Sequence, residues 1–239
     1  MKSKASIIFS LIFYPLFYLY ILLIIKPELI YHYQQLGFSF DKYYLIKYFT
    51  FPGGLAECAS LFLFQFNINS YSGALLYTLL TFLIICITGK IISQYLHKSN
   101  SIYYIAKYLP GILIAGLLTN YSFLTVFIFT VLLLLLFFYG FISIVKKHKS
   151  IFIQVISFII LSGLTYYISG GLAFLIFSFS SLIYALSKRE IKSIAFTIIT
   201  IITAVLIPFL ASRFLFFITI DSAYFKLIPQ YYFYEPGVL

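Results

Sequence analysis

The residues best suited to chemistry in this sequence lie in the stretch 51–69, which reads FPGGLAECASLFLFQFNIN. Pro52, Gly53 and Gly54 precede a lone acid, Glu57, and an apolar run follows. An ionised carboxylate partly out of water is costly unless it is paired, so Glu57 is a candidate catalytic residue. A helix N-terminus also stabilises an acid through its dipole, and Pro is favoured at the first helical position. An ordinary first-turn role is therefore an equally good interpretation of Glu57.

Metal and cofactor chemistry find little support in the sequence. His32, His97 and His148 fall in three different polar segments and cannot form one metal site. Cys58 and Cys86 lie in apolar surroundings without a ligand partner at metal-binding spacing, which favours core packing. The sequence contains no HExxH, GxSxG, phosphate-binding or dinucleotide-binding motif, so we predict no metal site and name no cofactor.

The composition excludes a soluble domain. Hydrophobic residues make up 63% of the 239 residues and charged residues only 9%, whereas soluble domains carry about a quarter charged residues. The net charge of +10 would suggest nucleic acid in a soluble protein. In a membrane protein such an excess usually lies in cytoplasmic loops, so the lipid bilayer is the expected partner and nucleic acid is not.

The hydropathy pattern predicts an all-α, polytopic membrane helix bundle that forms a single transmembrane domain over residues 1–239. We predict about seven transmembrane helices and read the first as an uncleaved span rather than a signal peptide. A turn is expected at Ser169, Gly170 and Gly171. The predicted spans are 5–25, 71–88, 102–118, 121–145, 151–168, 172–186 and 193–211.

Loop charges predict the orientation. Lys and Arg concentrate in four segments that would be cytoplasmic by the positive-inside rule: 1–4, 89–107, 146–149 and 188–192. This places the N-terminus in the cytoplasm and the C-terminus outside a bacterial inner membrane, but only if seven helices cross. The stretch 52–66 is then an interfacial or re-entrant helix. The segments 26–70 and 212–239 form an outer cap that collects most of the acids.

One block of residues resembles a family that is known only as a domain of unknown function. The block is PGGLAE-x-x-S-x-F-x-x-Q-F, formed by Pro52, Gly53, Gly54, Leu55, Ala56, Glu57, Ser60, Phe62, Gln65 and Phe66. With the Gly170-Gly171 turn and the tail residues Tyr231, Tyr232, Glu235 and Pro236, it resembles uncharacterised bacterial multi-pass inner-membrane proteins. The resemblance implies a membrane location and no reaction. Family members often continue into a C-terminal soluble region.

A second, architectural likeness is to the multi-pass glycosyltransferases that use lipid-linked sugars. By position, this likeness implies Asp41 or Glu57 as the base for an acceptor hydroxyl and Arg213 as the ligand of a polyprenyl phosphate. Gly53 and Gly54 are further candidate substrate-binding residues. The acidic pair typical of such enzymes is absent, and likeness of fold is a poor warrant for function.

Three functions therefore stay open. The first is a glycosyltransferase-like module acting on a lipid-linked or envelope glycan substrate at the extracytoplasmic face. The second is a non-catalytic membrane anchor or assembly partner. Transport ranks third, because the predicted spans contain mainly Ser, Thr and Gly as their polar residues.

Overall fold

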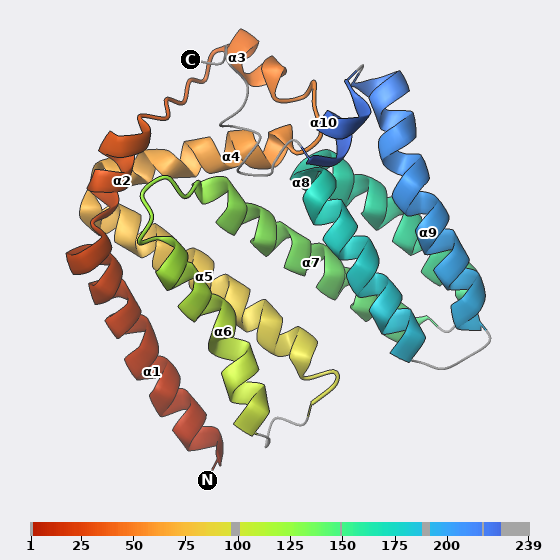
Figure 1. The fold of residues 1–239 in the computed structure, drawn as a ribbon. Coiled ribbons are helices and arrows are strands. Elements are labelled where there is room, and N and C mark those ends of the chain that lie inside the picture. The colour runs from red at the N-terminus through yellow and green to blue at the C-terminus, as the bar shows by residue number, and fades with distance from the viewer. Residues whose placement is uncertain (1, 97–100, 149, 188–191, 217, 226–239) are drawn as a thin grey trace. The chain divides into compact units, whose positions relative to one another are not determined.

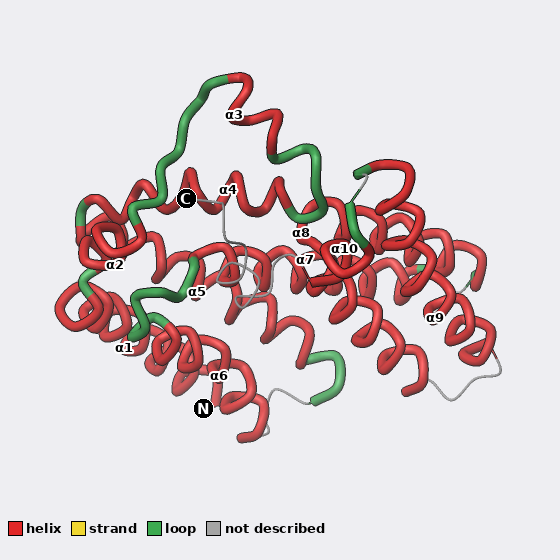
Figure 2. Tube along the Cα trace, turned by 45° about the horizontal axis from the view of Figure 1, so that its top comes forward, coloured by secondary structure: helices red, strands yellow, loops and turns green. Residues whose placement is uncertain are grey.

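The computed structural model of the chain describes residues 2–96, 101–148, 150–187, 192–216 and 218–225, and these form only helices with connecting turns and loops (Figures 1 and 2). They divide into two compact units. Unit 1 comprises Met1–Phe38 and Ala59–Leu132, and unit 2 comprises Ser39–Cys58 and Leu133–Leu239. The all-α class predicted from hydropathy is confirmed for the described residues.

Unit 1 begins with a helix that breaks at Lys26. Lys26 has a left-handed backbone (φ 55°), and Pro27 restarts the helix from its first position, where its missing N–H costs nothing. The segments on either side bend by 47°. The elements of this unit are α1 (Lys2–Tyr20), η1 (Ile21–Ile25), α2 (Pro27–Gln34), the second part of α4 (Gly54–Phe64), η2 (Gln65–Ile68), α5 (Ser70–Ile92), α6 (Ser101–Leu117) and the start of α7 (Thr125–Lys147).

Hydrogen bonds between distant side chains fix the interior of unit 1. Asn67 Nδ2 donates to the hydroxyl of Tyr77 at 2.9 Å, and that hydroxyl pairs with Thr125 Oγ1 at 3.0 Å. All three residues are buried. The network joins η2, α5 and α7, which are far apart in sequence.

Unit 2 is built around a folded-back helix. α8 (Ile151–Ser187) is interrupted at Gly170, whose φ of 87° and ψ of 176° are accessible to glycine and strained for other residues. The rings of Phe158 and Phe177 stack at 5.9 Å, although nineteen helical positions would separate them by about 28 Å in a straight helix. The two segments of α8 therefore lie against each other, and the predicted turn at Gly170 is confirmed (Figure 1).

The remaining elements of unit 2 surround this hairpin. Phe141 of α7 and Phe196 of α9 stack at 5.8 Å, and both contact Phe158, which makes an aromatic core between α7, α8 and α9. The other elements are α3 (Lys42–Lys47), the start of α4, α9 (Lys192–Leu210), η3 (Ala211–Leu215) and α10 (Ile220–Phe225).

The prediction of seven spans is wrong for the described residues. Four helices are long and apolar enough to cross a membrane, or five if the bent pair at Lys26 forms one span. The predicted span 102–118 corresponds to α6, whose 17 residues rise only about 26 Å against a hydrocarbon core of about 30 Å. The predicted spans 151–168 and 172–186 correspond to the two segments of α8, which counts as one kinked helix of 37 residues. The predicted span 5–25 does end at the bend before Pro27, as expected, and counts as a span only together with α2.

The short helix predicted near 52–66 is confirmed as α4, whose 11 residues rise only about 17 Å. It belongs to the helices that are too short to count as spans. The predicted orientation required seven crossings, so it stays a prediction.

Candidate functional site

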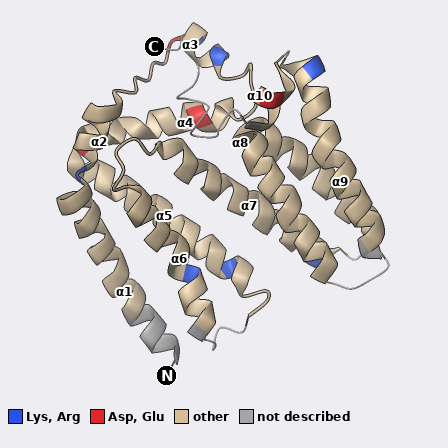
Figure 3. Cartoon of the chain, in the orientation of Figure 1, with Lys and Arg blue, Asp and Glu red and all other residues tan. Residues whose placement is uncertain are grey.

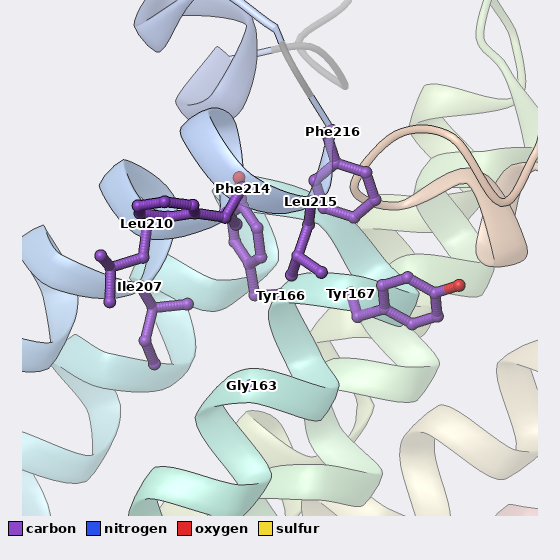
Figure 4. A pocket seen from close by; sticks show the side chains of 9 residues that line it. Gly163, Tyr166, Tyr167, Ile207, Leu210, Phe214, Leu215 and Phe216 are labelled. Carbon is purple, nitrogen blue, oxygen red and sulfur yellow. The ribbon is translucent and has the colours of Figure 1, made fainter.

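An apolar pocket of about 270 Å³ lies in unit 2, between α8, α9 and η3. Tyr166 and Tyr167 of α8 form one wall, and Phe216 covers both rings, stacking on Tyr167 at 5.9 Å (Figure 4). Its lining residues are Gly163, Tyr166, Tyr167, Ile207, Leu210, Ala211, Phe214, Leu215 and Phe216. The lining has almost no polar surface, so the pocket suits a hydrocarbon group.

The pocket lies next to the turn of α8, where α10 closes the unit. The hydroxyl of Tyr166 donates to the carbonyl of Ala223 at 3.1 Å, and the hydroxyl of Tyr224 contacts the carbonyls of Ala204 and Val205 at 3.3 Å. These bonds tie α10 to both α8 and α9. They hold Tyr166 as a fixed wall of the pocket.

The start of α4 is joined to the same wall. Gly53 has a φ of 83°, and its N–H donates to the carbonyl of Tyr167 at 3.0 Å. A side chain on Gly54 would overlap the carbonyl oxygen of Tyr48. The two glycines predicted as substrate-binding positions have structural contacts, because Gly53 bonds the α3–α4 turn to α8 and Gly54 leaves room for the carbonyl of Tyr48 within that turn.

Glu57 lies in the first turn of α4 and is half-buried. Its negative charge helps to raise the pKa of Tyr48, after the larger contribution of burial and the hydrogen bond to Tyr44. Burial, followed by Glu57, also raises the pKa of the Cys58 thiol. The carboxylate therefore has two weakly acidic neighbours, which stay protonated near neutral pH.

Asp41 caps a helix. Its Oδ2 accepts the backbone N–H groups of Tyr43 and Tyr44 at 3.0 and 3.2 Å, which satisfies the first turn of α3. An acid with these partners has a complete structural role. Asp41 stays a predicted catalytic residue that no geometry supports.

Arg213 is exposed in η3, directly before the pocket residues Phe214, Leu215 and Phe216. Asp41, Glu57 and Arg213 all belong to unit 2, although none of the three lines the pocket. Arg213 is the cation nearest in sequence to the lining residues.

In the described part of unit 2, the charged residues lie in two groups of elements. The charged residues Asp41, Lys42, Lys47, Glu57, Arg213 and Asp221 lie in or directly before α3, the start of α4, η3 and α10. Figure 3 colours the charges of these elements, of which α10 packs against α8 and the start of α4 follows Gly53, which bonds to Tyr167. Lys146 and Lys147 close α7 just before α8 begins, which is the end opposite the turn of α8. The pocket thus adjoins the end that carries acids and cations together.

Sequence reasoning missed the pocket. Its residues come from α8, α9 and η3 and share no motif; the one local signal is the Tyr166-Tyr167 pair just before the predicted turn. The tail residues Tyr231, Tyr232, Glu235 and Pro236 lie outside the described residues.

Several apolar helices of spanning length, with the charges of unit 2 at their ends, define a multi-pass α-helical membrane protein. The chain belongs to a family of unknown function (DUF6057), which matches residues 2–238. No curated protein and no solved structure matches it significantly. The predicted membership of an uncharacterised membrane-protein family is confirmed to this extent, whereas the comparisons give no support to the likeness with glycosyltransferases.

Proposed function

We propose that this membrane protein binds one lipid with an anionic headgroup through unit 2. The observation that carries the proposal is the apolar pocket walled by Tyr166 and Tyr167, which adjoins the charged end of the unit. Its volume is close to the lower end of the usual range for small-molecule sites, about 300–1,000 Å³. The hydrocarbon tail would occupy the pocket, and the headgroup would lie among the charges around the turn of α8.

Arg213 favours a phosphate in the headgroup. A guanidinium group donates two parallel hydrogen bonds to phosphate oxygens and loses less hydration than an ammonium group. Because Arg213 directly precedes Phe214 in η3, one amphiphile can contact the cation and the apolar lining together. A polyprenyl phosphate has the required chemistry.

If the bound lipid is also a substrate, the protein is a glycosyltransferase-like module at the extracytoplasmic face of the bacterial inner membrane. Glu57 is the better base, because it is half-buried and its helix begins beside Gly53, which bonds to the pocket residue Tyr167. Asp41 is less suited, because its Oδ2 already accepts two backbone hydrogen bonds. Because Asp41 is engaged in capping α3, the second candidate function is a non-catalytic anchor or assembly partner. Transport ranks third.

Filling the pocket tests lipid binding. A side chain at Gly163 would enter open space in the pocket, so Gly163→Leu should fold and exclude part of the tail. We expect lipid retained by the purified protein to fall about tenfold, because roughly 0.8 kcal/mol is lost for each CH₂ group left unburied. Native mass spectrometry measures the bound lipid.

Gly140→Leu is the matched control, because Gly140 also lies in a helix of unit 2 with open space around its Cβ position, away from the pocket. Equal lipid retention in both variants would contradict the proposal. Arg213→Gln should lower retention of phosphate lipids more than Lys146→Gln does, because Lys146 lies in the last turn of α7, away from the pocket.

Glu57→Gln separates the catalytic form from binding alone. If Glu57 is the base, this variant keeps the bound lipid but fails to complement a deletion strain, with membrane insertion checked separately. Full complementation leaves Glu57 a structural role and supports a non-catalytic protein.

A further inference from the structure

The segment around α3 exposes a stripe of large apolar side chains. The exposed fractions are 83% for Tyr43 and 47% for Ile46 on α3, and 77% for Phe40 and 52% for Phe49, which flank the helix in the preceding loop and the following turn. Within α3, Tyr43 and Ile46 are three positions apart and share one face of the helix. A continuous exposed apolar stripe of this kind usually marks an interaction surface.

The stripe is held outward by contacts on the opposite side of the segment. Asp41 caps the start of α3, and Thr50 Oγ1 donates to the carbonyl of Lys47 at 2.7 Å. Tyr48 is buried, and its hydroxyl donates to that of Tyr44 at 3.0 Å. These contacts keep the apolar side chains on the outer face of the segment. Figure 2 shows α3 as a short helix between two loops.

Two cations accompany the stripe. Lys42 and Lys47 are the first and last residues of α3, and both are exposed. The one acid of the segment, Asp41, is engaged with the backbone N–H groups of its own helix. The surface therefore presents aromatic rings with a positive charge at each end of the helix.

We propose that this stripe, formed by Phe40, Tyr43, Ile46 and Phe49, inserts into the headgroup layer of the bilayer that the protein spans. Lys42 and Lys47 then pair with the phosphates of anionic phospholipids. Aromatic side chains with an apolar body are suited to this depth, and short amphipathic helices with lysines lie in the same plane. The charges complement an anionic lipid surface, and the chain itself supplies the membrane.

A single tryptophan can report the environment of the stripe. The sequence contains no Trp, so the fluorescence of Tyr43→Trp comes from this position alone. The full chain is placed in lipid nanodiscs of phosphatidylcholine with or without phosphatidylglycerol. Phospholipids brominated near the headgroup end of the acyl chain, or near its terminal methyl, probe depth, and aqueous iodide probes exposure to water.

Phe179→Trp is the reference for a position on a spanning helix, because Phe179 lies on α8 with 64% exposure. We expect Tyr43→Trp to be quenched more by shallow than by deep bromines and to be protected from iodide. Strong quenching by iodide with no effect of brominated lipid would overturn the proposal. Protection that depends on protein concentration and not on lipid would overturn it too, in favour of a second protein copy.

The lysines are tested in the same reporter. With Lys42→Gln and Lys47→Gln together, the extra insertion caused by phosphatidylglycerol should be lost, by about fivefold in partitioning for each lysine at low salt. Lys146→Gln with Lys147→Gln is the matched control, because these residues lie at the other end of unit 2. An equal response of both pairs would show that the charge of α3 plays no part.

Discussion

Aromatic rings pack inside both units of this protein, but the tightly packed glycines of unit 1 lie against side chains, whereas Gly54 and Gly171 of unit 2 lie against backbone carbonyls. In unit 1, buried polar side chains reach across the chain, as Asn67, Tyr77 and Thr125 do. In unit 2, rings stack around Phe158, and backbone segments approach each other at Gly53 and Gly171. Within unit 2, the close backbone contacts lie beside the apolar pocket, and some of its lining residues directly follow Arg213. This difference supports the proposal that unit 2 binds the lipid.

The largest effect is expected at the closest backbone contact of unit 2. A Cβ on Gly171 would lie 2.5 Å from the carbonyl oxygens of Ala223 and Tyr224. Gly171→Val should therefore detach α10 and destabilise the protein by about 3 kcal/mol or more. Unfolding in detergent measures this loss, and lipid retention should fall with it.

The control for this change is Gly140→Val, because the Cβ position of Gly140 has open space. Equal stability of the two variants would mean that α10 does not depend on its contact with Gly171. The role assigned to backbone approach in unit 2 would then be wrong.

A medium effect is expected in unit 1. Tyr77→Phe removes the hydroxyl that joins Asn67 to Thr125 and leaves buried polar groups without this partner, which costs about 1–3 kcal/mol. Lipid retention should stay at the wild-type level, because the pocket belongs to unit 2. If Tyr77→Phe keeps its stability but loses bound lipid, the assignment of lipid binding to unit 2 is wrong.

The smallest effect is expected at Tyr48, and only at alkaline pH. Burial, followed by Tyr44 and Glu57, raises the pKa of Tyr48 above its ordinary value of about 10. The folded protein then keeps a proton that the unfolded chain loses, so this stabilisation is complete below pH 10 and declines as the pH rises further. Tyr48→Phe should flatten the fall of the unfolding midpoint above pH 10.

Tyr43→Phe is the matched control for Tyr48→Phe, because its side chain is exposed. Near neutral pH, the loss of the Tyr48–Tyr44 hydrogen bond should cost Tyr48→Phe only about 1 kcal/mol. If the alkaline slope is unchanged in Tyr48→Phe, burial of this phenol does not contribute to the pH dependence.

Features that depend only on neighbouring residues could be predicted from the amino-acid sequence. The apolar runs specify helices in a bilayer, Pro52 and the two glycines begin a helix too short to span, and Gly170 marks a turn. Each of these features follows from hydropathy or from the backbone freedom of a few adjacent positions. Asp41 before α3 is also a local cap, although the resemblance to glycosyltransferases drew attention to its charge instead.

The contacts between residues far apart in the chain could not be predicted, because they depend on how the helices pack. The pocket combines α8, α9 and η3, and the bond from Gly53 to Tyr167 joins positions more than a hundred residues apart. The number of spans was also predicted wrongly, because α6 is shorter than the hydrocarbon core and the two segments of α8 form one kinked element. Local propensity decides where a helix can form, and contacts between distant segments decide where it ends and what lies beside it.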